Sequence, residues 1–174
     1  LLNGKQATTF HNYIDALQYG RTQLRSPKGL PFSLRLIREM HKRLMKGVRG
    51  ASKQPGEFRS SQNWIGGSKP SNAHFVPPPP KRMKECLDLL EKYLHSKAND
   101  SDLVKIALIH VQFETIHPFL DGNGRLGRLL IALLLEHWGL LDARLLYLSL
   151  HFNRHQREYY QRLDGVRQAG DWEG

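Results

Sequence analysis

The chain has 174 residues, 40% of them hydrophobic, which is enough to bury one sizeable core and indicates a single domain over residues 1–174. Its 26 Lys and Arg against 16 Asp and Glu give a formal charge of +10, which favours anionic partners such as nucleotides, nucleic acid or acidic proteins. Its one cysteine, Cys86, excludes an internal disulfide and indicates a reducing, cytoplasmic compartment, and its longest apolar run, residues 129–135, is too short to cross a bilayer.

The first clear helical pattern covers residues 34–44. Its apolar side chains recur every three or four residues behind Ser33, a residue type that commonly caps helix N-termini. The next amphipathic stretch, residues 83–94, follows a run of prolines at 77–80. Such a run could bind an SH3-type domain, but its place directly before a helical pattern favours a role as helix leader.

Between these two stretches, residues 55–80 break the helical pattern. The segment is rich in Gly, Pro and Ser and contains two short apolar pairs, Trp64 with Ile65 and Phe75 with Val76. We expect a small β-hairpin with a polar tip, too small to be stable alone. The predicted fold class is therefore all-α with one hairpin.

Two central helices are predicted within residues 101–139, at 102–116 and 125–139. Both stretches carry apolar groups on more than one face, which is typical of helices buried in the middle of a domain. Ser101 is the expected N-cap of the first helix, and Gly139 marks the end of the second.

The segment HPFLDGNGRLGR, residues 117–128, lies between these two helices, where a packed core needs none of its polar residues. Pro118 disfavours helical geometry at His117, so the first helix should end there. The following GNGR, residues 122–125, can expose successive backbone N–H groups at the start of the second helix, where the helix dipole is positive. These features predict an anion site.

Charged and titratable side chains surround this predicted site. Arg125 and Arg128 are three apart on one face of the first turn, where their guanidiniums could grip phosphate oxygens. Asp121 could hold a Mg²⁺ ion that bridges phosphates, and His117 could act as a general base near neutral pH. Each feature alone is ordinarily structural, but their combination favours a phosphate site with a base beside it. The pattern is not a Walker loop, because no GxxxxGK followed by Ser or Thr occurs.

A last amphipathic stretch, residues 159–170, should end near Gly170. Just before it, His151 and His155 are four residues apart, as zinc ligands on one helix face can be. No Glu follows the first His and no third ligand is evident, so we expect a solvated basic helix start there rather than a metal site.

HPFLDGNGRLGR closely resembles the Fic motif, HPFx(D/E)GNGRxxR, and agrees with it at every defined position. Residues 55–80 resemble the Fic flap and residues 153–172 resemble the tail that follows the Fic core, so the resemblance spans nearly the whole chain. It implies a Fic-type helical domain with a small hairpin flap, acting as a protein adenylyltransferase. Such an enzyme uses ATP and Mg²⁺ to transfer AMP onto a hydroxyl side chain of a target protein.

The resemblance implies a role for each motif residue. His117 would deprotonate a Ser, Thr or Tyr hydroxyl of the target, which attacks the α-phosphate as pyrophosphate leaves. Asp121 would bind Mg²⁺, and Arg125 and Arg128 would neutralise the β- and γ-phosphates. The backbone N–H groups that would cradle the phosphates are those of Gly122, Asn123 and Gly124.

Two further segments receive roles by resemblance. The flap residues Ile65, Gly66 and Gly67 would hold a target segment by adding a strand at their edge. Tyr159 or Tyr160 would border the adenine, although ordinary helix packing explains this pair equally well.

Position 124 separates two activities within the family. Gly124 stands where the Doc-like branch, which phosphorylates its target, has Lys, so nucleotidyl transfer is favoured. The base of the nucleotide is not readable from the sequence. A Fic-fold transferase that uses another nucleotide or phosphate-linked donor stays an alternative.

Residues 1–20 resemble a remnant of the family's inhibitory helix, whose pattern is (S/T)xxxE(G/N). Asn3 stands at the expected Glu position. In that pattern the Glu pairs with the second motif arginine, here Arg128, and Asn cannot form this ion pair. We therefore hypothesise a de-inhibited enzyme, with a frayed terminus as the alternative interpretation of residues 1–4.

A non-catalytic basic module that binds nucleic acid or an acidic protein is the rival interpretation from another functional class. The basic residues are scattered, without a recognition-helix pattern or a basic stripe interleaved with aromatics, so we do not expect direct nucleic-acid binding. A homo-oligomer stays open, and the target protein is not readable. Because the chain begins at Leu1 without Met, we expect a piece of a longer protein.

Overall fold

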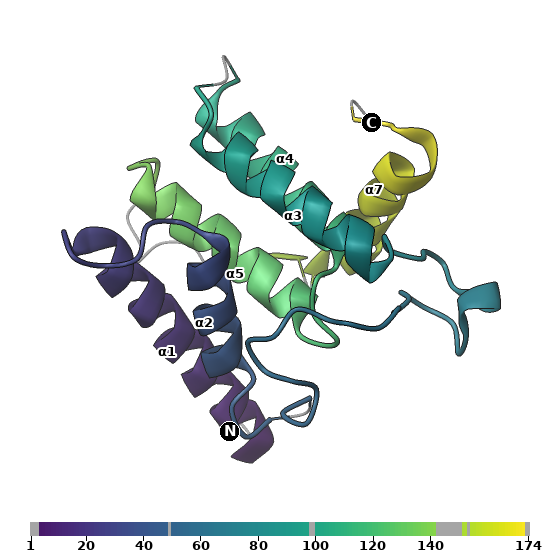
Figure 1. The fold of residues 1–174 in the computed structure, drawn as a ribbon, viewed down its shortest axis with the longest axis horizontal. Coiled ribbons are helices and arrows are strands. Elements are labelled where there is room, and N and C mark those ends of the chain that lie inside the picture. The colour runs from purple at the N-terminus through teal and green to yellow at the C-terminus, as the bar shows by residue number, and fades with distance from the viewer. Residues whose placement is uncertain (1–3, 49, 98–99, 142–150, 153, 173–174) are drawn as a thin grey trace.

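The computed structural model describes residues 4–48, 50–97, 100–141, 151–152 and 154–172, which form helices joined by loops. No β-strand occurs among these residues, so the predicted all-α class is confirmed (Figure 1). The α-helices are α1 (Gly4–Arg25), α2 (Leu34–Leu44), α3 (Pro80–His95), α4 (Asp102–Ile116), α5 (Asn123–His137) and α7 (Gln156–Ala169), and a short 3₁₀ helix, η1, covers Pro70–Asn72.

The helix α5 lies at the centre of the bundle. In Figure 1, α1 and α2 lie on one side of α5, and α3 and α4 lie on the other. The core side chains of α5 are Leu126, Leu129, Leu130, Leu133 and Leu134. Those of α4 are Ile106, Ile109, Phe113 and Ile116. The prediction that these two helices are central is confirmed, because their leucines and isoleucines fill the middle of one continuous core.

The predicted helix caps are present in the structure. The Ser33 hydroxyl accepts from the Leu36 N–H at 3.3 Å, and the Ser101 hydroxyl accepts from the Val104 N–H at 3.4 Å. Each bond satisfies one of the amides that a helix start leaves without an intrahelical partner. At the other end of the chain, Gly170 adopts a left-handed φ of 66° and ends α7 as predicted.

The helix α1 contains residues 4–20 of the segment that resembles an inhibitory helix, whereas Asn3 lies outside the described residues. The carboxylate of Glu136 on α5 ties α1 in place, since it accepts from Arg21 at 2.6 Å and from Arg25 at 2.7 Å. The two helices approach closely at Gly20, where a Cβ atom would lie 2.8 Å from the Leu133 side chain.

The flap, residues 55–80, does not form the predicted pair of strands. Among its described residues the only pairing is one antiparallel bridge, in which the Ile65 N–H donates to Phe75 O at 2.9 Å. On one side of the bridge, Gly66 and Gly67 adopt left-handed φ values of 70° and 66° and lead into η1. On the other side begin the prolines, which have no N–H to donate, so the ladder cannot lengthen in either direction.

The base of the flap is held by Arg59, whose side chain is buried at 1% exposure. Its guanidinium donates to His117 O at 2.9 Å and to Ser61 O at 3.1 Å, and it also bonds the Pro78 carbonyl. Its backbone N–H donates to Pro118 O at 2.9 Å. One residue therefore joins both ends of the flap to the segment that follows α4. The sequence analysis did not single it out.

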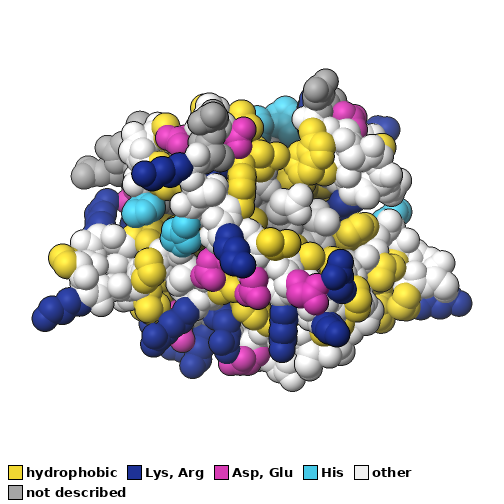
Figure 2. All heavy atoms as spheres, turned by 45° about the horizontal axis from the view of Figure 1, so that its top comes forward, with side chains coloured by type: hydrophobic (Ala, Val, Ile, Leu, Met, Phe, Trp, Pro, Cys, Tyr) yellow, Lys and Arg dark blue, Asp and Glu magenta, His cyan; other side chains and the backbone are white. Residues whose placement is uncertain are grey.

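The surface carries charges of both signs. Figure 2 shows Lys and Arg side chains lying among Asp and Glu side chains on one face. In the described part of the chain, no helix combines the length and the apolar character that crossing a membrane requires.

Replacing Arg59 tests whether the flap depends on it. Arg59→Met keeps an apolar stem but leaves several buried carbonyls without a donor, so we expect the free energy of unfolding to fall by about 2–4 kcal/mol. Urea unfolding monitored by circular dichroism gives this value. The matched control is Arg82→Met, whose exposed partner is Glu85, and it should change stability by less than about 0.5 kcal/mol. Equal stability of the two variants would contradict the proposed role of Arg59.

Candidate active site

The helix α4 ends at Ile116, directly before the turn that carries the motif. His117 adopts a left-handed conformation with φ 49° and ψ 61°, and its N–H donates to Phe113 O at 3.0 Å. A residue with a Cβ enters this region at a cost of roughly 1 kcal/mol. The hydrogen bond from Arg59 Nε to His117 O, at 2.9 Å, offsets this conformational cost. The predicted helix end is confirmed, and it is strained.

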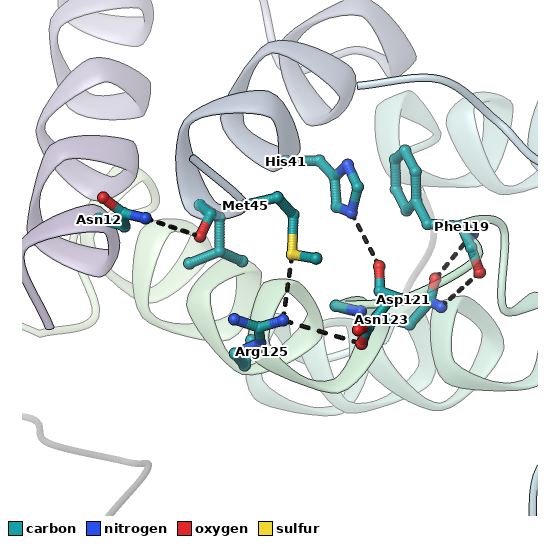
Figure 3. Close-up of polar contacts among 9 residues, drawn as sticks. Asn12, His41, Met45, Phe119, Asp121, Asn123 and Arg125 are labelled. Atoms are coloured by element: carbon teal, nitrogen blue, oxygen red, sulfur yellow. Dashed lines mark hydrogen bonds and ion pairs between the residues drawn. The ribbon is translucent and has the colours of Figure 1, made fainter. Parts of the chain in front are cut away.

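The turn closes through Asn123 and Gly122. The Asn123 side chain is 1% exposed and bonds the Phe119 backbone twice, with Oδ1 accepting at 2.9 Å and Nδ2 donating at 2.8 Å (Figure 3). Gly122 caps α5 with a φ of 85°, and a Cβ atom there would lie 2.6 Å from Met45 Sδ. Another residue type here would be strained by the left-handed φ and would require the Met45 side chain to move.

His41, on the buried face of α2, holds the turn from outside. Its ring stacks on Phe119 with 3.8 Å between centroids, and its Nε2 lies 2.9 Å from Asp121 O (Figure 3). The Gly56 N–H donates to Nδ1 at 2.8 Å, so Nε2 carries the proton and donates to Asp121 O. Burial lowers the pKa of His41 to about 4, although the Asp121 carbonyl opposes this. The only sequence signal for this residue is a histidine at a core position of the 34–44 pattern.

The side chains of Asp121 and Arg125 face one another at the open edge of the turn (Figure 3). Arg125 Nη2 lies 3.8 Å from Asp121 Oδ1, and both side chains are partly exposed, at 27% and 31%. Asp121 Oδ1 also accepts from the Gly122 N–H at 2.6 Å. A carboxylate and a cation are thus accessible at the N-terminus of α5, which suits a bound anion together with its counter-ion.

Asp121 alone would be the protein ligand of a metal here. Among the described residues, no group of three or more His, Cys, Asp and Glu side chains could hold an ion by itself. Mg²⁺ commonly binds through one or two carboxylates and completes its shell with phosphate oxygens and water. The single accessible carboxylate therefore fits a Mg²⁺ ion that arrives with a nucleotide, and it does not fit a resident metal cage.

His117 is a neutral imidazole in this environment. Burial lowers its pKa to about 4, and the positive charges of Arg167 and Arg59 act in the same direction, while its contact with the Glu114 backbone opposes them. Its Nδ1 lies 3.4 Å from Glu114 O. A neutral ring at pH 7 can accept a proton, as a general base must.

Arg128 lies behind the turn, on the side of α4. A Cβ atom on Gly124 would lie 3.4 Å from Arg128 Nη1 and 3.9 Å from Glu114 Oε1, so both groups border the first turn of α5. Glu114 is 4% exposed. Burial raises the pKa of Glu114 to about 7, although the charges of Arg128 and Arg167 act in the opposite direction.

The two tyrosines of α7 differ in their surroundings. The Tyr159 hydroxyl lies 2.9 Å from His110 Nε2, and burial raises the pKa of this tyrosine. Tyr160 is 46% exposed. Tyr159 borders a cavity of about 870 Å³ between α4, α5 and α7, and no residue of the 117–128 motif is among the described residues that line it. This mainly apolar cavity lacks the phosphate-binding groups of the turn.

Apart from the exposed Tyr160, the predicted site residues that the structure describes fall into three groups. The motif turn brings together His117, Asp121, Gly122, Asn123, Gly124 and Arg125. Arg128 and Tyr159 lie behind it, and Ile65, Gly66 and Gly67 lie in the flap. The sequence analysis missed Arg59, His41 and Arg167, which contact the backbone of the turn or of the end of α4.

Known proteins resemble this chain over most of its length. The sequence model of the Fic/DOC family matches residues 31–135. The protein adenylyltransferase Fic of Drosophila grimshawi is 32% identical over 144 residues, covering 82% of this chain and 26% of that protein. The probable protein adenylyltransferase of Aquifex aeolicus is 35% identical over 108 residues, covering 62% and 31%. This chain thus spans about a quarter to a third of the length of these relatives.

A solved structure shows the same fold. The crystal structure of a Fic family protein from Desulfovibrio desulfuricans G20 superposes with a TM-score of 0.76 at 26% identity, and it covers 98% of this chain and 49% of that one.

The buried His41 makes stability depend on pH. The unfolded chain protonates this residue near its ordinary value of 6.5 and the folded chain only near 4. The full stabilisation is therefore present above pH 6.5. As the pH falls from 6.5 to about 4, His41 lowers the free energy of unfolding by up to about 1.4 kcal/mol per pH unit. We expect His41→Gln to be less stable at pH 7 and to lose stability less steeply on acidification, as measured by urea unfolding at pH 7, 6 and 5.

The exposed residue His137 at the end of α5 provides the control. His137→Gln should keep the wild-type slope. A wild-type slope in His41→Gln would show that this histidine does not contribute.

Proposed function

The chain belongs to the Fic/DOC family, and we propose that it is a protein adenylyltransferase, which moves AMP from ATP to a hydroxyl side chain of a target protein. The observation that carries the proposal is the complete motif turn, with a neutral His117 at its start and the N-terminus of α5 at its end. The names of the two related adenylyltransferases support it.

In the proposed reaction, His117 Nε2 accepts the proton of the target hydroxyl. The hydroxyl oxygen then bonds to the α-phosphorus, and the bond from that phosphorus to the oxygen bridging the α- and β-phosphates breaks. Pyrophosphate leaves with the electron pair of this bond. The pKa of His117 near 4 keeps the ring neutral and ready to accept.

The phosphates would bind at the first turn of α5. The first intrahelical bond of α5 runs from the Leu126 N–H to Gly122 O at 3.0 Å. The amides of residues 123–125 therefore precede the helical ladder and can donate to phosphate oxygens along the helix dipole. In this scheme Arg125 and Arg128 neutralise the outer phosphates, and Asp121 holds Mg²⁺, which supplies further positive charge to the phosphate oxygens.

The flap would supply the surface for the target segment. Ile65 uses both its N–H and its C=O in the bridge to the Phe75 side. In an antiparallel pair the neighbouring residues present their polar groups to the opposite edge. The backbone N–H and C=O groups of Trp64 and Gly66 would therefore be available to an incoming strand. Gly67 has no side chain and would leave room for that strand. The adenine would lie on the side of α7, where Tyr159 and Tyr160 are candidates to border it.

The first test is transfer of label from ATP. With Mg²⁺, ATP labelled at the α-phosphate and host lysate, the protein should label a target covalently. We expect His117→Ala to lose at least about 100-fold in rate, because a positioned base contributes 10²–10⁴, while it still binds ATP. The control His137→Ala, at the far end of α5, should label normally.

Other outcomes of this test have definite meanings. Label from a different nucleotide but not from ATP would indicate a Fic-fold transferase with another donor. If no label is transferred and nucleotide does not stabilise the protein against heat, the enzyme interpretation is excluded and a binding module is favoured.

Position 3 provides a separate test, because we also propose that the enzyme is de-inhibited by Asn3. A glutamate at this position could pair with Arg128 and withdraw it from the phosphates. Asn3→Glu should therefore lower the rate of AMP transfer by roughly tenfold, equivalent to about 1.4 kcal/mol. The matched control Asn3→Gln adds length without charge and should retain the full rate. An unchanged rate in Asn3→Glu would remove the idea of de-inhibition.

A further inference from the structure

Arg167, on α7, reaches the end of α4 although it lies outside the segment matched by the family model. Its side chain is 3% exposed. Nη2 donates to Glu114 O at 3.0 Å, and Nη1 pairs with Asp164 at 3.4 Å. The guanidinium carbon also lies 5.0 Å from the centre of the Phe75 ring of the flap. A buried arginine is costly unless it binds something specific.

The acceptor at Glu114 exists because of Pro118. In a continuing helix the Glu114 carbonyl would accept from the N–H of the residue four positions later. That residue is Pro118, which has no N–H. The carbonyl therefore takes its donors from elsewhere, and two are within reach: Arg167 Nη2 at 3.0 Å and His117 Nδ1 at 3.4 Å.

The second contact bears on where His117 carries its proton. A carbonyl oxygen can only accept, so the contact is a hydrogen bond only when Nδ1 is protonated. In the neutral ring the lone pair then lies on Nε2. At 3.4 Å this bond is long. A long bond keeps its direction only if its acceptor, the Glu114 carbonyl, is held in place. Arg167 holds that carbonyl with a shorter bond of 3.0 Å.

We propose that Arg167 is a positioning residue for His117, which fixes the Glu114 carbonyl and thereby keeps the ring in the tautomer with its proton on Nδ1. The proposal rests on the proposed function, in which Nε2 is the atom that accepts the hydroxyl proton. Arg59 fixes the backbone carbonyl of His117 from the flap, and Arg167 fixes the partner of the ring from α7. Through Phe75 it also links this support to the flap.

The proton position can be measured without any nucleotide. In the ¹⁵N-labelled chain at pH 7, the imidazole nitrogens report the tautomer, and the His117 signals are those absent from His117→Ala. Wild type should show the Nδ1–H form. Arg167→Met should shift His117 towards the Nε2–H form and lower kcat by at least about tenfold, because a base in the wrong tautomer cannot accept the proton, with KM for ATP changed less than kcat.

Two variants separate positioning from charge and from helix packing. Arg157→Met removes an exposed arginine of the same helix and should leave both the tautomer and kcat unchanged. Arg167→Lys keeps the charge but loses the fork that reaches Glu114 and Asp164 together, so it should behave like Arg167→Met. A wild-type tautomer in both Arg167 variants would overturn the positioning role.

The wild-type spectrum is decisive even if the Arg167 variants do not fold. A proton on Nε2 of His117 in wild type would overturn the proposal, whatever the activity. Absence of AMP transfer by wild type would instead refute the proposed function, and the Nδ1–H signal would still be observed. The two failures are therefore distinguishable.

Discussion

The end of α4 just before Pro118 is the constraint on which the site depends. A proline two residues after the end of α4 leaves the Glu114 carbonyl without its helical donor, and the helix end itself leaves the later carbonyls without theirs, so this buried backbone must find other donors. Arg59 supplies them from the base of the flap, to His117 O at 2.9 Å and to Ile116 O at 3.4 Å. Arg167 supplies one from α7, to Glu114 O at 3.0 Å. Two segments distant in the sequence thus supply donors to the carbonyls at the end of α4.

The electrostatics of the turn follow from the two helix ends that it joins. The C-terminus of α4 is the negative end of its dipole, which makes burial of Arg59 and Arg167 there less costly. The N-terminus of α5 is the positive end of its dipole, which favours an anion there. His117 lies between these ends and is buried beside the two arginines, so its pKa falls to about 4 and it is neutral at pH 7. The arrangement that ends one helix thus also places a neutral imidazole next to the positive end of another.

The small residues of the motif make room for a polar layer behind the turn. A Cβ atom on Gly127 would lie 2.3 Å from Glu114 Oε1, and one on Gly122 would lie 2.6 Å from Met45 Sδ. Glycine at 127 therefore lets the buried carboxylate of Glu114 lie against α5, next to Arg128. Burial in this layer raises the pKa of Glu114 to about 7. Part of the glycine content of the motif thus serves packing and not only the exposure of backbone N–H groups.

Interactions between residues close together in the chain allowed much of this structure to be predicted from the sequence. Helix spans, the caps at Ser33 and Ser101, and the end of α4 before Pro118 depend on residues within a few positions of one another, so spacing alone predicts them. Tertiary structure decided the rest. His41 and Asp121 lie 80 residues apart, Arg59 and His117 lie 58 apart, and Arg167 and Glu114 lie 53 apart. No local pattern encodes such partners, because each bond exists only after the helices have packed. The flap shows the same limit: composition indicated a hairpin, whereas the positions of Gly66, Gly67 and the prolines allow one bridge.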